Sequence, residues 1–421
     1  MVHIALLAAA LAQTASPPSV VKGPYLVDPR PDGITIRFET TSPVAAEVRY
    51  AAPGEGEREV ASAARTDHAV KLVGLRPGTR YRYQVAVGGQ PTEEQGFRTA
   101  PPPDVPFSFV VMGDTRSAEA DHRAVIAQLA GEAPDLVLHT GDLVADGAEE
   151  AGWQSFFSVQ APLLGRAPIA PAIGNHEAQN QLGIQNFSRY FGVTPRDGEM
   201  RYAFTYGNSR FIVMDTNLMF FALTAQTGWL ERELQSAVAD PDVRHIFVMM
   251  HHGPFATGPH GGNTGVRAAW APLFSAYGVD TVFSGHDHLY ERLEHDGVRY
   301  VVSGGGGGPL YPRQEDPHWE DARASVYTES VHHFVRVQVA GERVEMAAVR
   351  ADGSLIETVR WRIAERRVRP RPLVSGAAPS PRAAGFGAMW IAVVSAAVCA
   401  GLAVLVIGLR RRAASDGRNG R

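Results

Sequence analysis

The sequence has little cysteine and no concentration of positive charge. Its 421 residues include one cysteine, Cys399, so no intrachain disulfide can form. Cys399 lies in an apolar segment, where a cysteine is usually a small buried hydrophobic residue. The net charge is −4 at pH 7, and no stripe of basic residues is present that could follow a nucleic-acid backbone. These absences argue against a disulfide scaffold and a nucleic-acid-binding surface, and the length predicts two or three globular domains.

Five short segments place Asp, Asn and His side chains directly after apolar, β-branched runs. The runs predict strands, and they are Phe107–Met112, Leu136–His139, Ile169–Ile173, Ile246–Met250 and Thr281–Phe283. The segments that follow them are Gly113-Asp114-Thr115-Arg116, Gly141-Asp142, Gly174-Asn175-His176-Glu177, His251-His252-Gly253-Pro254 and Gly285-His286-Asp287-His288. Open α/β sheets bind ligands at the carboxyl ends of their strands. The mixture of carboxylate, amide and imidazole donors suits Zn, Mn or Fe and argues against a thiolate site.

The five segments, in this order, resemble those of the calcineurin-like metallophosphoesterases and, within them, the purple acid phosphatases. The run from Gly285 to Arg292 is very similar to that family's signature around its last two metal ligands. The resemblance implies hydrolysis of phosphate esters at a centre of two divalent ions (Fe, Mn or Zn), by attack of a metal-bound hydroxide on phosphorus. The competing interpretation of these residues is that they are turn residues and hydrogen-bonded core histidines.

The resemblance also implies which side chains bind the metals. One carboxylate bridges both ions in the family, and here that position is Asp142. The remaining ligands divide between the two ions, with Asp114 and His288 on the first and Asn175, His251 and His286 on the second.

Two more residues are expected beside these ligands without binding a metal. His252 competes with His251 for one ligand position, and the family places its ligand histidine first in this segment. Asp215 follows the apolar run Phe211–Met214, at another expected strand end.

Three residues are expected to act on the substrate: Arg116, His176 and His260. In the family, the counterpart of His176 contacts the phosphate or protonates the leaving group, which suits imidazole near neutral pH. His260 matches a further histidine of the family, although it could also be an exposed loop residue. Arg116 could donate two hydrogen bonds to a phosphate, or it could pair with a neighbouring carboxylate.

The sequence departs from the family pattern at two positions of the first metal. Purple acid phosphatases have a tyrosine three residues after the bridging aspartate, and here that residue is Ala145. Other calcineurin-like enzymes have a histidine two residues after the first aspartate, and here that residue is Arg116. The first metal therefore lacks one protein ligand.

Residues 20–100 are predicted to form a small all-β sandwich. Apolar and polar residues alternate, with Gly and Pro turns between them, over Ile34–Phe38, Ala46–Tyr50, Ala69–Leu72 and Tyr81–Val87. The segment from Leu75 to Tyr81 resembles the fibronectin type III pattern, in which a tyrosine closes a corner of the sandwich. Purple acid phosphatases of the plant type carry such a domain before the catalytic one.

Residues 105–364 are predicted to form a layered α/β domain, a metallophosphoesterase sandwich. Helical periodicity over Ala118–Gly131, Thr227–Ala239 and Thr264–Tyr277 alternates with the predicted strands. The glycine run Gly304–Gly308 either cradles a phosphate or turns the chain beside the site.

Both ends of the chain carry targeting signals. Residues 1–15 are a probable signal peptide, with an apolar run that ends in Ala10-Leu11-Ala12. Residues 386–409 lack charge and predict a transmembrane helix; Arg410-Arg411-Arg412 place the tail, residues 410–421, in the cytoplasm. Residues 365–385 predict a disordered linker. We therefore expect a single-pass protein of the cell membrane with its catalytic domain outside the cytoplasm; a cleaved sorting signal and a buried soluble helix are the alternatives.

Two rival functions fit the same sequence. One is a nucleotide or phospholipid phosphodiesterase on the same scaffold. The other is a surface binding module with a degenerate metal site, which the missing ligands of the first metal would favour. Intact Gly174–Glu177 and Gly285–His288 favour the enzyme.

Overall fold

The structure is a computed structural model that describes residues 17–217 and 220–363. The predicted signal peptide (1–15), linker (365–385), transmembrane helix (386–409) and tail (410–421) lie outside the described residues. Within the described ranges, no helix combines the length and the apolar character needed to span a bilayer.

The N-terminal part is all-β, as predicted. Its strands are β1 (Val20–Arg30), β2 (Gly33–Ala51), β3 (Arg58–Val73), β4 (Arg80–Val87), β5 (Gln90–Pro91) and β6 (Gln95–Arg98). The two short strands expected around Ile34 and Val48 are one long strand, β2, which was not foreseen. The register of β2 against β3 shifts near Val44. On its other side, β2 pairs with β1 before this point and with β4 after it.

The tyrosine corner of this part forms as the sequence indicated. The Tyr81 hydroxyl accepts a hydrogen bond from the Arg76 backbone N–H at 2.9 Å. Tyr81 is buried, and its ring packs on that of Phe97 with 5.6 Å between centroids. The contact fits the predicted fibronectin III-like corner, and the assignment to that domain type stays a prediction.

Buried tyrosines join the N-terminal strands to the α/β part. Tyr25 donates its hydroxyl proton to the Tyr190 carbonyl, and Tyr83 donates to the Gly165 carbonyl, both at 2.8 Å. Lys22 is 2% exposed and pairs with Glu39 at 2.9 Å and with Glu150. These contacts fix the two parts against each other through both apolar and charged groups.

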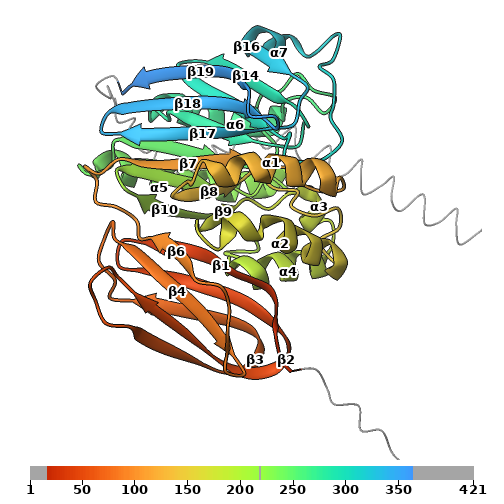
Figure 1. The fold of residues 1–421 in the computed structure, drawn as a ribbon. Helices are drawn as coiled ribbons and strands as arrows, with labels where there is room; N and C mark the ends of the chain where they lie inside the picture. The colour runs from red at the N-terminus through yellow and green to blue at the C-terminus, as the bar shows by residue number, and fades with distance from the viewer. Residues whose placement is uncertain (1–16, 218–219, 364–421) are drawn as a thin grey trace, which may run out of the picture. The chain divides into compact units, whose positions relative to one another are not determined.

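Two sheets form the α/β part (Figure 1). One has the order β19 (Leu355–Arg362), β18 (Arg343–Arg350), β17 (His333–Ala340), β7 (Phe107–Met112), β8 (Leu136–His139), β9 (Ile169–Pro171). The other has the order β10 (Tyr202–Tyr206), β11 (Ser209–Val213), β12 (His245–Met249), β13 (Thr281–Ser284), β15 (Val298–Ser303), β14 (Tyr290–His295), β16 (Ser325–Glu329). Strands β7, β8 and β9 run parallel at one side of the first sheet. Strands β11, β12 and β13 run parallel within the second sheet, so in each sheet the carboxyl ends of these strands lie together.

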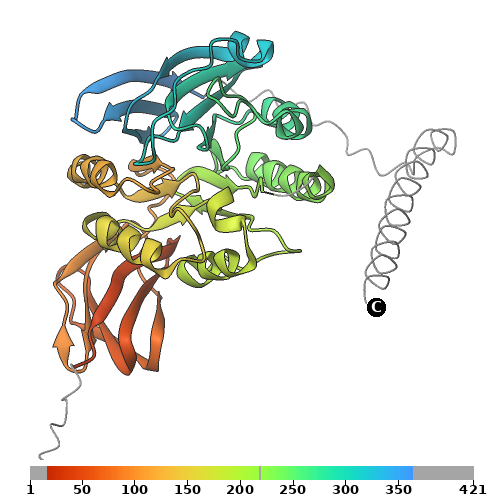
Figure 2. The same cartoon turned by 90° about the vertical axis from the view of Figure 1, so that its right-hand side faces the viewer.

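The two sheets pack face to face, and helices cover their outer faces (Figures 1 and 2). Successive residues of a strand point to opposite faces. Phe109 therefore packs between the sheets, 5.1 Å from the Phe247 ring, whereas Val110 faces the helices α1 (Glu119–Gly131) and α2 (Glu150–Leu164). Helices α5 (Phe220–Ala239) and α6 (Thr264–Ala276) cover the other sheet. The predicted α/β sandwich is confirmed. Helices α1, α5 and α6 correspond to the three predicted helices, and α5 begins earlier than predicted, at Phe220.

Candidate metal centre

The predicted donors come together at the carboxyl ends of the parallel strands. Asp114 follows β7, Asp142 follows β8, and Asn175 opens the short helix α3 (Asn175–Ala178) after β9. His251 and His286 follow β12 and β13 of the other sheet. The site is therefore assembled from both sheets; the sequence predicted the strand ends but not their division between two sheets.

Backbone geometry at the site is unusual. Asp114, Asp142 and His286 have φ of 57°, 54° and 72°. These values lie in the left-handed region of backbone conformation, which residues other than glycine rarely adopt. Gly141 has φ of 103°, and a Cβ at that position would lie 2.7 Å from His251 Nδ1. The chain is bent sharply here, and this places the carboxylates against the imidazoles.

One part of the centre, which we call the second position, consists of Asp142, Asn175, His251 and His286. The Nδ1–H group of His251 donates to the Thr140 carbonyl at 2.9 Å, so the lone pair of this ring is on Nε2. That Nε2 lies 2.9 Å from Asn175 Oδ1 and 3.4 Å from Asp142 Oδ1. Burial lowers the pKa of His251 well below its ordinary value, so no proton separates these acceptors. Three acceptor atoms facing one another fit a bound cation.

More imidazoles surround this position. The His286 ring centroid lies 5.1 Å from that of His251, 4.3 Å from that of His252 and 4.2 Å from that of His260. Burial lowers the pKa of His252 to about 4 and also lowers the pKa of His286. Neutral imidazoles are the form that binds metals. Two groups have donor atoms close enough to hold an ion: Asp114 with Asp142 and His251, and His251 with His252 and His286.

His252, which we expected beside the ligands, therefore lies among the possible donors. Its ring Nδ1 is 3.0 Å from the Thr216 hydroxyl, and its backbone N–H donates to the same oxygen at 2.9 Å. Asp215 accepts from the backbone N–H groups of Met200 and Asn217 and holds this loop in place. The role predicted for Asp215, support without metal binding, agrees with these contacts.

The other part of the centre, which we call the first position, consists of Asp114, Asp142 and His288. His288 Nδ1 donates to the Pro309 carbonyl at 2.6 Å, and its Nε2 lies 3.4 Å from Asp114 Oδ1. Burial, and then the neighbouring Asp142 carboxylate, raise the pKa of Asp114 well above its ordinary value. The two buried carboxylates therefore need positive charge between them to remain ionised.

Arg116 supplies positive charge at the first position. Its Nε lies 3.3 Å from Asp142 Oδ2, and its terminal nitrogen lies 3.4 Å from His288 Nε2. Its side chain is 16% exposed. Of the two alternatives that the sequence left open, pairing with a carboxylate is the one observed.

The other two residues expected to act on substrate lie at the same site. His176 Nδ1 donates to the Ala145 carbonyl at 2.5 Å, and its Nε2 lies 3.7 Å from Asp142 Oδ2. His260 is exposed, and its backbone N–H donates to Asp287 Oδ1 at 3.0 Å. Both rings are near the donors, and their roles remain proposals.

Glu177 was not assigned a role from the sequence, although it lies within a singled-out segment. It is fully buried, and its carboxylate accepts hydrogen bonds from the backbone N–H groups of Asp142 (3.1 Å), Val144 (3.1 Å) and Gly174 (2.9 Å). Burial raises its pKa to about 8. Glu177 thus ties the loop after β8 to the loop after β9.

Tyr311 was missed altogether, since no motif surrounds it. Its ring stacks on His288 with 4.1 Å between centroids and 7° between planes. Its hydroxyl lies 3.5 Å from the Arg116 guanidinium. Tyr311 therefore packs against the first position from a segment that follows the glycine run.

The glycine run itself packs against the site. The N–H of Gly306 donates to the Gly113 carbonyl at 2.9 Å, and the N–H of Gly308 donates to the Asp114 carbonyl at 2.7 Å. A Cβ on Gly306 would lie 2.4 Å from the Gly113 oxygen. Glycine is required by this close approach, and both amides are already hydrogen-bonded. Of the two predictions for this run, the turn beside the site fits.

A family comparison supports this geometry. Residues 107–290 match the model described as Calcineurin-like phosphoesterase. The chain contains a calcineurin-like phosphoesterase domain. The resemblance that the five segments indicated is thereby confirmed for these residues.

Known proteins extend the likeness of the phosphoesterase domain. An uncharacterized protein of Mycobacterium tuberculosis is 30% identical over 291 residues, which cover 60% of this chain and 54% of that protein. Purple acid phosphatase 15 of Arabidopsis thaliana is 26% identical over 289 residues, covering 57% and 53%. The chain thus spans about half the length of the curated relatives it matches. The structure of purple acid phosphatase PPD1 from yellow lupin (Lupinus luteus) seeds matches the fold with a TM-score of 0.73 and 18% identity, covering 84% of this chain and 75% of that one.

The tyrosine of purple acid phosphatases has no equivalent beside the first position of the phosphoesterase domain. Ala145 lines a cavity of about 230 Å³ together with Arg116, Ser117, Val144 and Ser155 among others. Tyr206 and Tyr290 cannot replace the missing ring, because their hydroxyls bond to Asp135 O at 3.3 Å and to Glu357 Oε1 at 2.6 Å.

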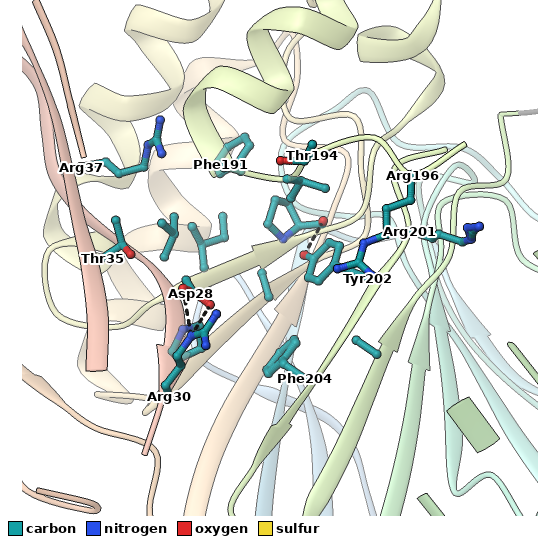
Figure 3. Close-up of a pocket in the computed structure, with 18 residues that line it drawn as sticks. Asp28, Arg30, Thr35, Arg37, Phe191, Thr194, Arg196, Arg201, Tyr202 and Phe204 are labelled. Atoms are coloured by element: carbon teal, nitrogen blue, oxygen red, sulfur yellow. Dashed lines mark hydrogen bonds and ion pairs between the residues drawn. The ribbon is translucent and has the colours of Figure 1, made fainter. Parts of the chain in front are cut away.

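A larger cavity, of about 380 Å³, lies between β1 and β9–β10 (Figure 3). Arg30, Arg196 and Tyr202 line it, but no predicted site residue does. Arg30 is paired with Asp28 at 3.0 Å, and Tyr202 donates to the Pro171 carbonyl at 2.8 Å. The cavity contains none of the clustered carboxylate, amide and imidazole donors of the strand-end site.

Proposed function

We propose that this chain is a metal-dependent phosphatase that hydrolyses phosphate esters at the centre between the two sheets. The observation that carries the proposal is the cluster of buried acceptors, in which His251 Nε2 lies 2.9 Å from Asn175 Oδ1 with no proton between them. A bound cation would stabilise such a cluster of acceptors. The intact cluster counts against a binding module with a degenerate metal site.

The donor set fits divalent Fe, Mn or Zn, which accept carboxylate, amide and imidazole ligands. Asp142 would bridge a first position with Asp114 and His288 and a second position with Asn175, His251 and His286. Bound divalent ions polarise phosphoryl oxygens and make water nucleophilic at neutral pH.

The chain's own residues then orient the substrate and move a proton. His176 is held by the Ala145 carbonyl, which leaves its Nε2 facing the centre beside Asp142. In the protonated form, His176 Nε2–H can donate to the leaving oxygen of the ester. The exposed His260, whose ring centroid lies 4.2 Å from that of His286, is placed to contact the phosphate. Glu177 keeps the loops that carry Asp142 and Asn175 in register.

The test is hydrolysis by variants of the donors. Asp142→Asn and Asn175→Ala should each lower kcat at least 100-fold while the far-UV spectrum is unchanged, in a screen of phosphomonoesters and phosphodiesters at defined metal. Asp104→Asn, which changes a carboxylate that is 86% exposed, is the control. Near wild-type turnover in both donor variants would refute the metal centre, and the preferred ester would decide between a monoesterase and the rival diesterase.

The same proposal includes export and anchoring. The uncharged run 386–409 before Arg410-Arg411-Arg412 supports an outward-facing domain on a single span. Protease added to intact cells should release an active soluble fragment by cleavage within residues 365–385. Full protection of the chain, with activity confined to the cytosol, would contradict this topology.

A further inference from the structure

We propose that the Arg116 guanidinium serves as a permanent cation at the first position, so that the chain binds one metal ion tightly, at the second position. The inference rests on the proposed metal centre and changes its composition. The two positions differ in whether the histidine electron pair already has a donor.

At the second position, the electron pair on His251 Nε2 has neither a proton nor a hydrogen-bond donor in the described part of the chain. His251 uses Nδ1 on the Thr140 carbonyl, and its Nε2 faces only Asn175 Oδ1 and Asp142 Oδ1. Acceptors that face one another at 2.9 Å repel unless a cation lies between them. This position therefore gains free energy from a metal ion.

At the first position, the corresponding electron pair already has a partner. His288 uses Nδ1 on the Pro309 carbonyl, and its Nε2 faces the Arg116 guanidinium at 3.4 Å. The same guanidinium lies 3.3 Å from Asp142 Oδ2. A metal bound to His288 would lie about 2.0–2.1 Å from Nε2, in the direction that the guanidinium nitrogen occupies. A metal and Arg116 therefore compete for one place.

Charge leads to the same conclusion. The Asp114 and Asp142 carboxylates carry two negative charges, and Arg116, which is always protonated in proteins, adds one positive charge. One divalent ion therefore brings these groups close to neutrality, whereas a second would leave a large excess of positive charge. Neither group of donors close enough to bind an ion includes His288, within the residues that the structure describes.

The packing keeps Arg116 in this place. The Tyr311 ring covers His288, and its hydroxyl lies 3.5 Å from the guanidinium. Arg116 Nε is buried, and no group in the described part of the chain accepts a well-directed hydrogen bond from it, which leaves its interaction with Asp142 electrostatic. The cavity beside Ala145 gives the arginine stem room where a tyrosine ring would stand.

Metal counting on the full chain tests this inference without any substrate. The protein is stripped with chelator, dialysed against Mn²⁺, and analysed for bound metal and by electron paramagnetic resonance. The wild type should retain one ion per chain, with the six-line signal of an isolated Mn²⁺. Arg116→Gln, which removes the charge, and Arg116→His, which adds an imidazole donor two residues after Asp114, should each bind two ions that are magnetically coupled. Arg123→Gln, an exposed arginine of α1 paired with Glu119, should still bind one.

Three results would overturn the inference. Two ions in the wild type at the same free Mn²⁺ would show that Arg116 does not exclude the metal, and would leave the proposed function standing. One ion in the folded Arg116→Gln and Arg116→His proteins would show that another feature limits the first position. No bound metal in any variant would remove the proposed metal centre together with this inference.

Discussion

The Glu177 carboxylate accepts a hydrogen bond from the backbone N–H of Asp142 at 3.1 Å. It also accepts from Gly174 at 2.9 Å, directly before Asn175. One buried side chain therefore fixes the positions of two donors that come from different loops. Neither contact involves a side chain of the donors, so Glu177 acts on the site only through the backbone.

We expect Glu177→Gln to lower both stability and activity. The amide NH₂ would face backbone N–H groups, and an unsatisfied buried donor costs about 1–3 kcal/mol. Urea unfolding should show this loss. Metal affinity should fall as well, because Asp142 and Asn175 would no longer be held in place. Glu149→Gln, at an exposed position, is the matched control; equal effects of the two substitutions would remove Glu177 from this role.

The oxidised, iron-loaded protein should be colourless. The purple colour of the resembled phosphatases comes from tyrosinate bound to ferric iron, and Ala145 stands where that tyrosine would be. Tyr311 is the tyrosine whose hydroxyl lies near Arg116, and it contacts no carboxylate of the centre in the described contacts. A visible spectrum checks this. An intense band that disappears in Tyr311→Phe would show that Tyr311 moves in as a ligand.

Acid should destabilise the fold through His122. Burial lowers the pKa of this side chain to about 3, and its Nε2 accepts a hydrogen bond from Gln160 at 3.0 Å. An unfolded histidine titrates near 6.5, so between pH 6.5 and 3 the unfolded chain binds a proton that the folded chain does not. Stability is therefore retained above pH 6.5 and falls as the pH drops, by up to about 1.4 kcal/mol per pH unit for this group.

Urea unfolding across this pH range measures the effect. His122→Gln retains an acceptor for Gln160 and should flatten the pH dependence. His295→Gln, whose ring is 38% exposed, should leave it unchanged. The same slope in all three proteins would assign the acid sensitivity to other groups.

Metal removal should lower the melting temperature. The donors after β7, β8 and β9 belong to one sheet, and those after β12 and β13 belong to the other, so a bound ion links the two sheets. A ligand at 100 times its dissociation constant stabilises the folded state by about 2.7 kcal/mol. Calorimetry with chelator and with added Mn²⁺ should show a difference of several degrees, which Asn175→Ala should abolish. An unchanged difference in Asn175→Ala would mean that the ion binds elsewhere.

Two of the predicted strands match the structure residue for residue. Phe107–Met112 and Leu136–His139 coincide with β7 and β8. The strand expected to reach Ile173 ends at Pro171 instead, because its neighbour β8 ends at His139, the residue that pairs with Pro171. No bounds were predicted for helix α2, which contains Gly152 and Pro162, two residues that normally disfavour helices. Its buried face, which includes Trp153 and Phe156, outweighs that preference through tertiary packing.

The sequence predicted those residues of the candidate site that lie within short motifs. Each donor adjoins a strand end, so local sequence was sufficient to place it. The contacts of Arg116 with His288 and of Tyr311 with the same ring join residues that are far apart in the sequence. No local pattern records such contacts, and only the packing of the two sheets brings them about.

The left-handed backbone at Asp114, Asp142 and His286 lowers the stability of the fold, but it places the side chains that are proposed to bind the metal. Such a conformation costs a residue with a Cβ about 1–2 kcal/mol, which glycine would largely avoid. A sequence selected for stability alone would therefore replace these side chains with glycine and would lose the donors. Stabilised variants obtained by unguided screening should accumulate changes at these strand ends, and a screen that also demands metal retention should keep them intact.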